Sequence, residues 1–84
     1  MLNREGTLTP EEAFASVLKE RRLALGLKQT DLEADDVMDR SYISKLELGK
    51  RQVCLRGILH LAAVLHMSPG ELMEAVATRM KGGR

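Results

Sequence analysis

The chain has little of what many small folds use for stability. It contains one cysteine, one tyrosine, one phenylalanine and no tryptophan in 84 residues. A single cysteine, Cys54, cannot form an internal disulfide, so the fold must depend on packing or on association with another chain. The lack of disulfides favours a reducing, cytoplasmic location. Two aromatic side chains are too few for a platform on which single-stranded nucleic acid could stack.

Long hydrophobic runs are also missing. The longest apolar stretch extends from Ile58 to Met67 and is interrupted by His60. A membrane span needs about 18 apolar residues, so we expect no membrane partner. No secretory hydrophobic segment stands near the N-terminus. A chain of this length buries roughly 60% of its unfolded surface, which predicts one small domain with a modest core.

Arrangements typical of enzymes and metal sites are absent from the sequence. We find no carboxylate pair, no Ser/His/Asp set and no glycine-rich phosphate loop, so no catalytic activity and no cofactor are expected. Cys54, His60 and His66 follow one another at intervals of six residues, which does not align them on one helix face. We therefore predict no metal site, and we interpret Cys54 as a small residue at a helix start rather than a redox sensor.

The net charge of +1 conceals a strong asymmetry along the chain. Residues 1–39 hold nine acidic and five basic residues, whereas residues 40–84 hold three acidic and eight basic residues. Five of these bases fall within seventeen residues: Arg40, Lys45, Lys50, Arg51 and Arg56. Such a separation favours a surface for a polyanion. An ordinary surface with randomly separated charges is the alternative.

Helix-start and helix-stop signals predict an all-α domain of five short helices. The sequence Thr9-Pro10-Glu11-Glu12 has the form of a capping box with proline at the first helical position, and Gly26 supplies a stop. The five helices are expected at about 10–25, 29–36, 40–48, 55–66 and 69–79. We expect residues 1–8 to form a flexible arm, 9–80 the domain, and 81–84 a flexible tail.

The expected third helix has two chemically different faces. Ile43 and Leu46 share one face and must point inward. The opposite face is short, polar and basic, and consists of Arg40, Ser41, Ser44 and Lys45. Two short helices joined by a tight turn cross steeply, so the second can enter a major groove. The alternative is a solvated face on which Arg40 pairs with Asp36.

The segments 25–32 and 39–51 resemble the lambda-repressor-like (Cro/repressor, XRE) helix-turn-helix family. The run R-S-Y-I-S-K-L-E-L-G-K-R, residues 40–51, carries most of the resemblance, which extends over about residues 14–76. Among the members of this family, the small controller proteins of restriction–modification systems are especially similar. The resemblance implies a five-helix DNA-binding domain whose helix-turn-helix consists of helices 2 and 3.

The resemblance also implies roles for individual residues. Gln29 would touch a phosphate at the start of helix 2, and Arg40 would contact guanine. The implied DNA-binding set is Gln29, Arg40, Ser41, Tyr42, Ser44, Lys45, Lys50 and Arg51. Of these, Ser41 and Tyr42 could meet the sugar–phosphate backbone, and Lys50 and Arg51 would hold phosphates. Arg22 and Glu47 match the internal ion pair of the family.

Five residues depart from the family pattern. Glu33 replaces a small residue, and Val37 replaces a glycine at the turn. Val53-Cys54 replaces Pro-Ser/Thr, so we expect the next helix to lose a good cap, and His66 replaces a glycine. Glu33, Asp35 and Asp36 also make helix 2 acidic, so we expect a single copy to bind DNA weakly.

The last expected helix suits self-association. Leu72, Val76 and Met80 recur at intervals of four, and Met73 flanks them. We predict a dimer interface at Met73, Val76 and Met80; the alternative is that this stripe covers the domain's own core. The sequence therefore predicts a homodimeric, sequence-specific regulator of transcription that binds a pseudo-palindromic operator in double-stranded DNA. No small-molecule effector is expected. The competing interpretation is an antitoxin-like or adaptor protein of the same fold whose main partner is another protein.

Overall fold

The computed structural model describes residues 8–82, whose regular elements are all helices joined by irregular links. Its elements are four α-helices and one short 3₁₀ helix: α1 (Pro10–Ala24), η1 (Gln29–Leu32), α2 (Arg40–Glu47), α3 (Leu55–Val64) and α4 (Pro69–Met80). The arm and tail expected at the chain ends lie outside the described residues, except for Leu8 and residues 81–82. Within residues 8–82, no helix is both long enough and apolar enough to cross a membrane.

Two of the helix starts are capping boxes, and the sequence pattern at Thr9 predicts the first of them. At α1 the Thr9 hydroxyl accepts the Glu12 N–H at 3.1 Å, and the Glu12 carboxylate accepts the Thr9 N–H at 3.0 Å. Ser68 and Glu71 make the same reciprocal contacts at the start of α4. Each box satisfies two backbone N–H groups that have no partner within the helix, and so fixes the first residue of the helix.

The predicted second helix is wrong beyond Leu32, so the described residues hold four α-helices rather than five. After η1 the chain runs in an irregular link over residues 33–39. The Asp35 carboxylate accepts the N–H groups of Val37 and Met38, both at 3.0 Å, and the Ala34 N–H donates to the Met38 carbonyl at 3.0 Å. These local bonds compete with a helix. They also turn Met38 into the core, where it is fully buried.

The expected loss of a cap at Cys54 is also wrong. Cys54 is the N-cap of α3, and its Sγ accepts the Gly57 N–H at 3.3 Å. Sulfur is a weak acceptor, but the residue has the extended backbone of an N-cap and satisfies one N–H group of the first turn. The cap therefore survives the departure from the family pattern.

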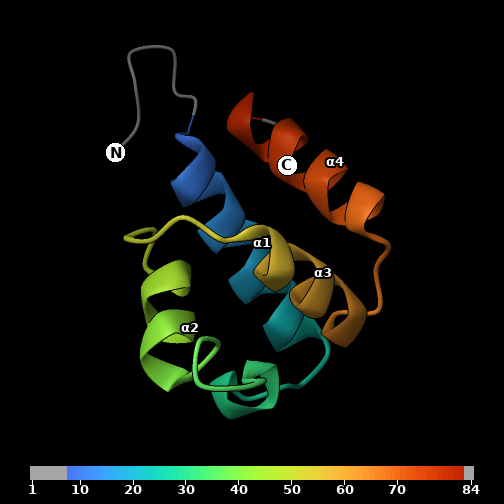
Figure 1. Ribbon diagram of the computed structural model, residues 1–84. Helices are drawn as coiled ribbons and strands as arrows, with labels where there is room; N and C mark the ends of the chain where they lie inside the picture. Colours follow the sequence, from blue (N-terminus) through green and yellow to red (C-terminus); the bar gives the residue numbers. More distant parts are fainter. Residues whose placement is uncertain (1–7, 83–84) are drawn as a thin grey trace.

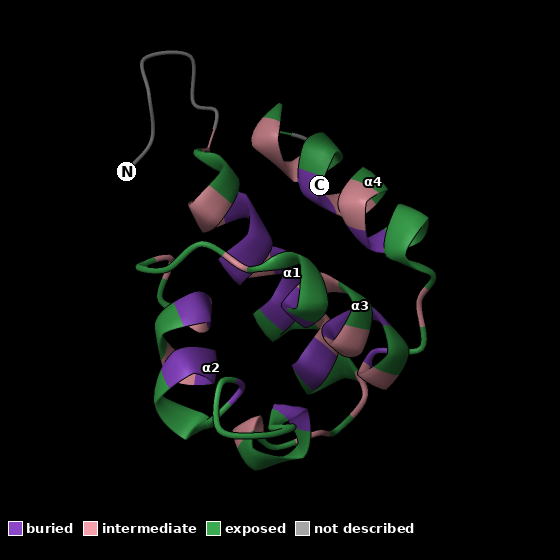
Figure 2. Ribbon diagram, viewed as in Figure 1, coloured by how far each residue is buried: buried purple, intermediate pink, exposed green. Residues whose placement is uncertain are grey.

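The core forms between α1 and the helices α2 and α4 that pack on it, while α3 packs against α4 and η1. Figure 1 shows α2 and α4 on opposite sides of the molecule, and Figure 2 shows the buried segments of each helix turned inward. Among the fully buried side chains are Leu18, Leu32, Ile43, Leu46, Leu61, Leu65 and Leu72. The inward orientation of Ile43 and Leu46 is confirmed. Arg79 ties α4 to α1 through hydrogen bonds to Ser16 and Glu20.

Candidate nucleic-acid interface

The outward face of α2 is basic and open to solvent. Asp39 caps the helix by accepting the Tyr42 N–H at 2.9 Å, and α2 ends where Gly49 takes a left-handed backbone with φ +73°. Ile43 and Leu46 anchor the inner face of the helix. On the outer face Arg40, Ser41 and Lys45 are exposed and Ser44 is half-buried. The helix therefore offers two cations and two hydroxyls from a surface that the core holds in place.

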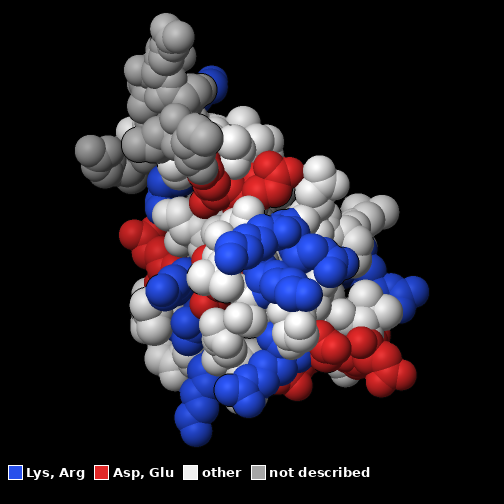
Figure 3. Space-filling model, turned by 90° about the vertical axis from the view of Figure 1, so that its left-hand side faces the viewer, with Lys and Arg blue, Asp and Glu red and all other residues white. Residues whose placement is uncertain are grey.

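The segment after α2 extends this positive surface. Lys50 and Arg51 are exposed and follow Gly49 directly. Figure 3 shows lysine and arginine side chains gathered on the side of the molecule that carries α2 and the α2–α3 link. Among residues 8–82, none of the four cations Arg40, Lys45, Lys50 and Arg51 forms an ion pair with an acidic side chain. Asp36, the alternative partner of Arg40, is likewise not paired with it there. We call Arg40, Lys45, Lys50 and Arg51 the basic face.

The acidic link lies beside this face and partly offsets it. Arg56 on α3 approaches the Asp35 carboxylate at 3.9 Å, and both side chains are well exposed. Hydrogen bonds from the Met38 and Val37 N–H groups hold the pKa of Asp35 below its ordinary value. Asp35 is therefore ionised at neutral pH and reduces the contribution of Arg56 to the positive surface.

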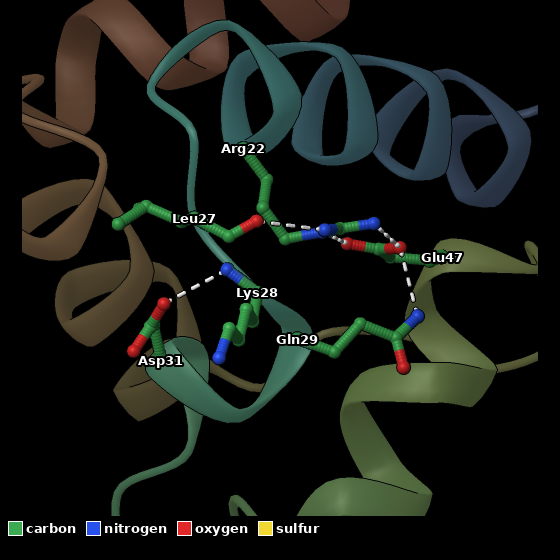
Figure 4. Close-up of polar contacts among 6 residues, drawn as sticks. All are labelled: Arg22, Leu27, Lys28, Gln29, Asp31 and Glu47. Atoms are coloured by element: carbon green, nitrogen blue, oxygen red, sulfur yellow. Dashed lines mark hydrogen bonds and ion pairs between the residues drawn. The ribbon is translucent and has the colours of Figure 1, made fainter.

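A buried ion pair fixes α2 against α1 (Figure 4). Arg22 Nε and Nη2 donate to the two oxygens of Glu47 at 2.6 and 3.0 Å, and Arg22 Nη1 donates to the Leu27 carbonyl at 2.9 Å. Gln29 Nε2 donates to Glu47 Oε1 at 3.0 Å. The structure thus brings Arg22, Gln29 and Glu47 together at the junction of α1, η1 and α2. The phosphate contact expected of Gln29 stays a prediction. In the free protein the side-chain amide of Gln29 instead donates to Glu47.

Tyr42 belongs to α2 but lies on its buried side, away from the exposed residues of that helix. Its side chain is largely buried, with 7% of the residue exposed. Its hydroxyl donates to the Gln52 carbonyl at 3.1 Å and accepts the Cys54 N–H at 3.0 Å. Burial raises the pKa of the phenol. No pattern in the sequence predicts these bonds, since the partners are backbone groups of the link that follows.

The residues predicted for a dimer interface are mostly covered by the domain itself. Val76 is 8% exposed and belongs to the core, whereas Met73 and Met80 are partly buried. Met73 and Val76 line an apolar hollow of about 240 Å³ together with Phe14 and Val53. On α3 two large apolar side chains are exposed, Leu55 by 73% and Leu59 by 52%.

Comparisons with known proteins agree with this geometry. Residues 13–76 match the family described as "Helix-turn-helix domain". A search of curated proteins finds no similar sequence.

Solved structures of three regulators are similar to the chain. The restriction–modification controller protein C.AhdI from Aeromonas hydrophila is 42% identical, with a TM-score of 0.66 over 74% of this chain and 94% of that one. The controller protein C.Esp1396I is 25% identical, with a TM-score of 0.71 over 86% and 92%. The clp gene regulator ClgR from Corynebacterium glutamicum is 22% identical, with a TM-score of 0.78 over 88% and 79%, and shares the fold. The chain therefore belongs to the helix-turn-helix domain family of DNA-binding regulators.

Proposed function

We propose that the chain regulates transcription by binding an operator in double-stranded DNA, with α2 in the major groove. The observation that carries this proposal is the basic face, which is exposed and unpaired among the described residues while Ile43 and Leu46 anchor the same helix to the core. An α-helix with its side chains is about 10–12 Å in diameter, and the major groove, which is about 12 Å wide, admits it. The dimensions and the chemistry of α2 both suit that groove.

The proposed contacts divide by position. Arg40 lies in the first turn of α2 and has the planar donor pair that guanine accepts, while Ser41, Ser44 and Lys45 offer further donors to base edges. Lys50 and Arg51 lie beyond the helix and are proposed to hold phosphates. Phosphate contacts supply most of the affinity and base contacts most of the discrimination.

We further propose that two copies bind together on a pseudo-palindromic site. One copy offers a single short helix, and the acidic link beside it carries Glu33, Asp35 and Asp36, all exposed. Pairing two weak half-sites multiplies affinity without any new contact to DNA. The similarity to C.AhdI and C.Esp1396I supports a role like theirs, as a controller of a restriction–modification system. For the contact between copies we propose Met73 and Met80, whose side chains are partly buried, together with the exposed Leu55 and Leu59.

Selection from a randomised duplex pool, performed at two salt concentrations, tests the proposal. We expect recovery of a two-fold symmetric motif whose half-sites lie about one duplex turn, about 34 Å, apart. Binding without any motif, lost at moderate salt, would contradict it and would leave the basic face as a nonspecific electrostatic surface. In that case a co-purifying protein partner would support the alternative of an adaptor or antitoxin.

A further inference from the structure

The hydroxyl of Tyr42 joins α2, the helix proposed to read the bases and here called the reading helix, to the segment that carries Lys50 and Arg51, the cations proposed to hold phosphates. Tyr42 belongs to α2, whereas the two groups that its hydroxyl contacts, the Gln52 carbonyl and the Cys54 N–H, belong to the link between α2 and α3. One oxygen therefore bridges two backbone groups that lie ten and twelve residues further along the chain. Among the described residues, no other side chain of α2 makes a hydrogen bond to residues 50–54.

The ring of Tyr42 contacts the same segment. The Arg51 guanidinium lies over the ring, with its central carbon 5.1 Å from the ring centroid. Such a contact attracts a cation to the negative face of an aromatic ring. The hydroxyl thus fixes the backbone on one side of Arg51, and the ring restrains its guanidinium.

The consequence concerns how the two parts of the basic face move. Lys50–Gln52 is an irregular segment that crosses open surface, and an arginine side chain loses rotamer entropy when it is immobilised. A cation that is already oriented in the free protein loses less entropy on binding than one that must be ordered then. Holding Arg51 on the ring of a residue in α2 therefore sets the phosphate-binding segment at a fixed place relative to the reading helix.

We propose that Tyr42 is a positioning residue, which acts on DNA through Arg51 and not through direct contact. The inference rests on the proposed function, because it assigns how one part of that DNA-binding surface is held. It differs from the sequence-based expectation, in which the Tyr42 side chain meets the sugar–phosphate backbone itself. With 7% of the residue exposed and both hydrogen-bonding roles of its hydroxyl occupied, Tyr42 has little left to offer a phosphate.

A double-mutant cycle on DNA binding separates the two roles. Tyr42→Phe keeps the ring and removes the bridging hydroxyl, and Arg51→Ala removes the cation that it positions. We expect Tyr42→Phe to weaken operator and random duplex binding by a similar factor, about 3–10-fold, and to lower the salt dependence of log K by up to about 0.9, the value for one phosphate contact. In the Arg51→Ala background Tyr42→Phe should have almost no further effect.

Arg56→Ala supplies the matched control. Arg56 is an exposed arginine on α3 that contacts Asp35 and not Tyr42. In the Arg56→Ala background the effect of Tyr42→Phe should remain at full size. Equal losses from Tyr42→Phe in the Arg51→Ala and Arg56→Ala backgrounds would overturn the proposal, as would a loss confined to one base pair of the operator.

A second measurement needs no DNA. Amide hydrogen exchange of the free protein should be faster at Cys54 in Tyr42→Phe than in the unsubstituted chain, because the acceptor of that N–H is gone. Exchange at Leu65, whose N–H donates to the Leu61 carbonyl at the C-terminal end of α3, is the internal reference for stability. Unchanged exchange at Cys54 would overturn the positioning role alone. Absence of duplex binding by the unsubstituted chain would overturn the proposed function and with it this inference.

Discussion

Arg22 and Glu47 form a two-point ion pair that joins α1 to the end of the reading helix. The distances are 2.6 Å from Nε to Oε2 and 3.0 Å from Nη2 to Oε1, and the two side chains are only 10% and 3% exposed. The hydrogen bonds to Glu47 raise the pKa of Arg22. The guanidinium therefore stays charged, and the Glu47 carboxylate supplies its partner where water has little access.

Removing one partner of this pair should be costly. We expect Glu47→Ala to lower the free energy of unfolding by about 3–5 kcal/mol, because it leaves the Arg22 guanidinium buried without its counter-ion. A domain of this size is stabilised by only about 4–12 kcal/mol, so much of the total is at stake. Urea unfolding followed by circular dichroism measures the change.

The double variant Arg22→Met/Glu47→Leu is the control for that experiment. It removes both charges and fills the space with apolar groups, so it should be more stable than Glu47→Ala. A loss below about 1 kcal/mol in Glu47→Ala would contradict a buried pair, since that is the range of exposed pairs.

His66 occupies a backbone conformation that suits glycine. Its φ is +60°, and it follows the last turn of α3, where its N–H donates to the Ala63 carbonyl at 3.1 Å. A left-handed backbone costs a non-glycine residue about 1–2 kcal/mol, whereas the extra freedom of glycine in the unfolded chain costs about 0.4–1 kcal/mol. His66→Gly should therefore raise the free energy of unfolding by about 0.5–1 kcal/mol, which thermal unfolding would record as an increase of a few degrees in Tm. Ala63→Gly, in the helix just before it, should lower stability by about 1 kcal/mol. A decrease in both variants would contradict this account of the α3 end.

Cys54 should react as an acidic thiol. The Gly57 N–H at the start of α3 holds the pKa of Cys54 below its ordinary value, and the residue is exposed. The thiolate is the reactive form, so the midpoint of alkylation against pH should lie lower in the folded protein than in the protein unfolded in urea. Coincident midpoints would show that the cap does not stabilise the thiolate.

Replacing Arg40 or Lys50 by alanine should weaken DNA binding in different ways. Arg40→Ala is expected to cost roughly 1–3 kcal/mol at one base position of the operator, whereas Lys50→Ala should weaken all duplexes alike and reduce the salt slope by about 1. Arg40→Ala should not lower stability, because it removes a cation from the first turn of α2, where the helix dipole disfavours it. Titrations of single-base operator variants distinguish the two patterns. If Arg40→Ala bound operator DNA and random DNA as tightly as the unsubstituted chain does, Arg40 would not be one of the residues that contact the bases.

The parts of the fold that could be predicted are those that local chemistry decides. The boxes at Thr9 and Ser68 contain both their donors and acceptors within four residues, so the sequence alone defines these helix starts. The inward face of α2 follows from helical spacing, since Ile43 and Leu46 are three residues apart and both are apolar, so both turn toward the core. The prediction of a helix through residue 36 was wrong after Leu32, because the hydrogen bonds to the Asp35 carboxylate and the burial of Met38 favour a turn there.

What could not be predicted depends on contacts between distant segments. The hydroxyl of Tyr42 has backbone partners, and backbone groups leave no pattern in a sequence. The exposure of Leu55 and Leu59 was equally hidden, because the apolar face of α3 is wider than the core that receives it. Periodicity identifies an apolar face but does not show how much of it the rest of the chain covers.

The exposed leucines of α3 give the last prediction, which concerns self-association. If the contact between two copies includes Leu59, burying its side chain contributes about 1.5–3 kcal/mol to association, and Leu59→Glu should raise the dimer dissociation constant at least about tenfold. Leu23 on α1 is matched in exposure, 58% against 52%, so Leu23→Glu is the control and should leave association unchanged. Sedimentation equilibrium over a range of protein concentrations measures both variants. Dissociation by Leu23→Glu alone would place the contact on α1, and it would contradict a dimer formed through α3 and α4.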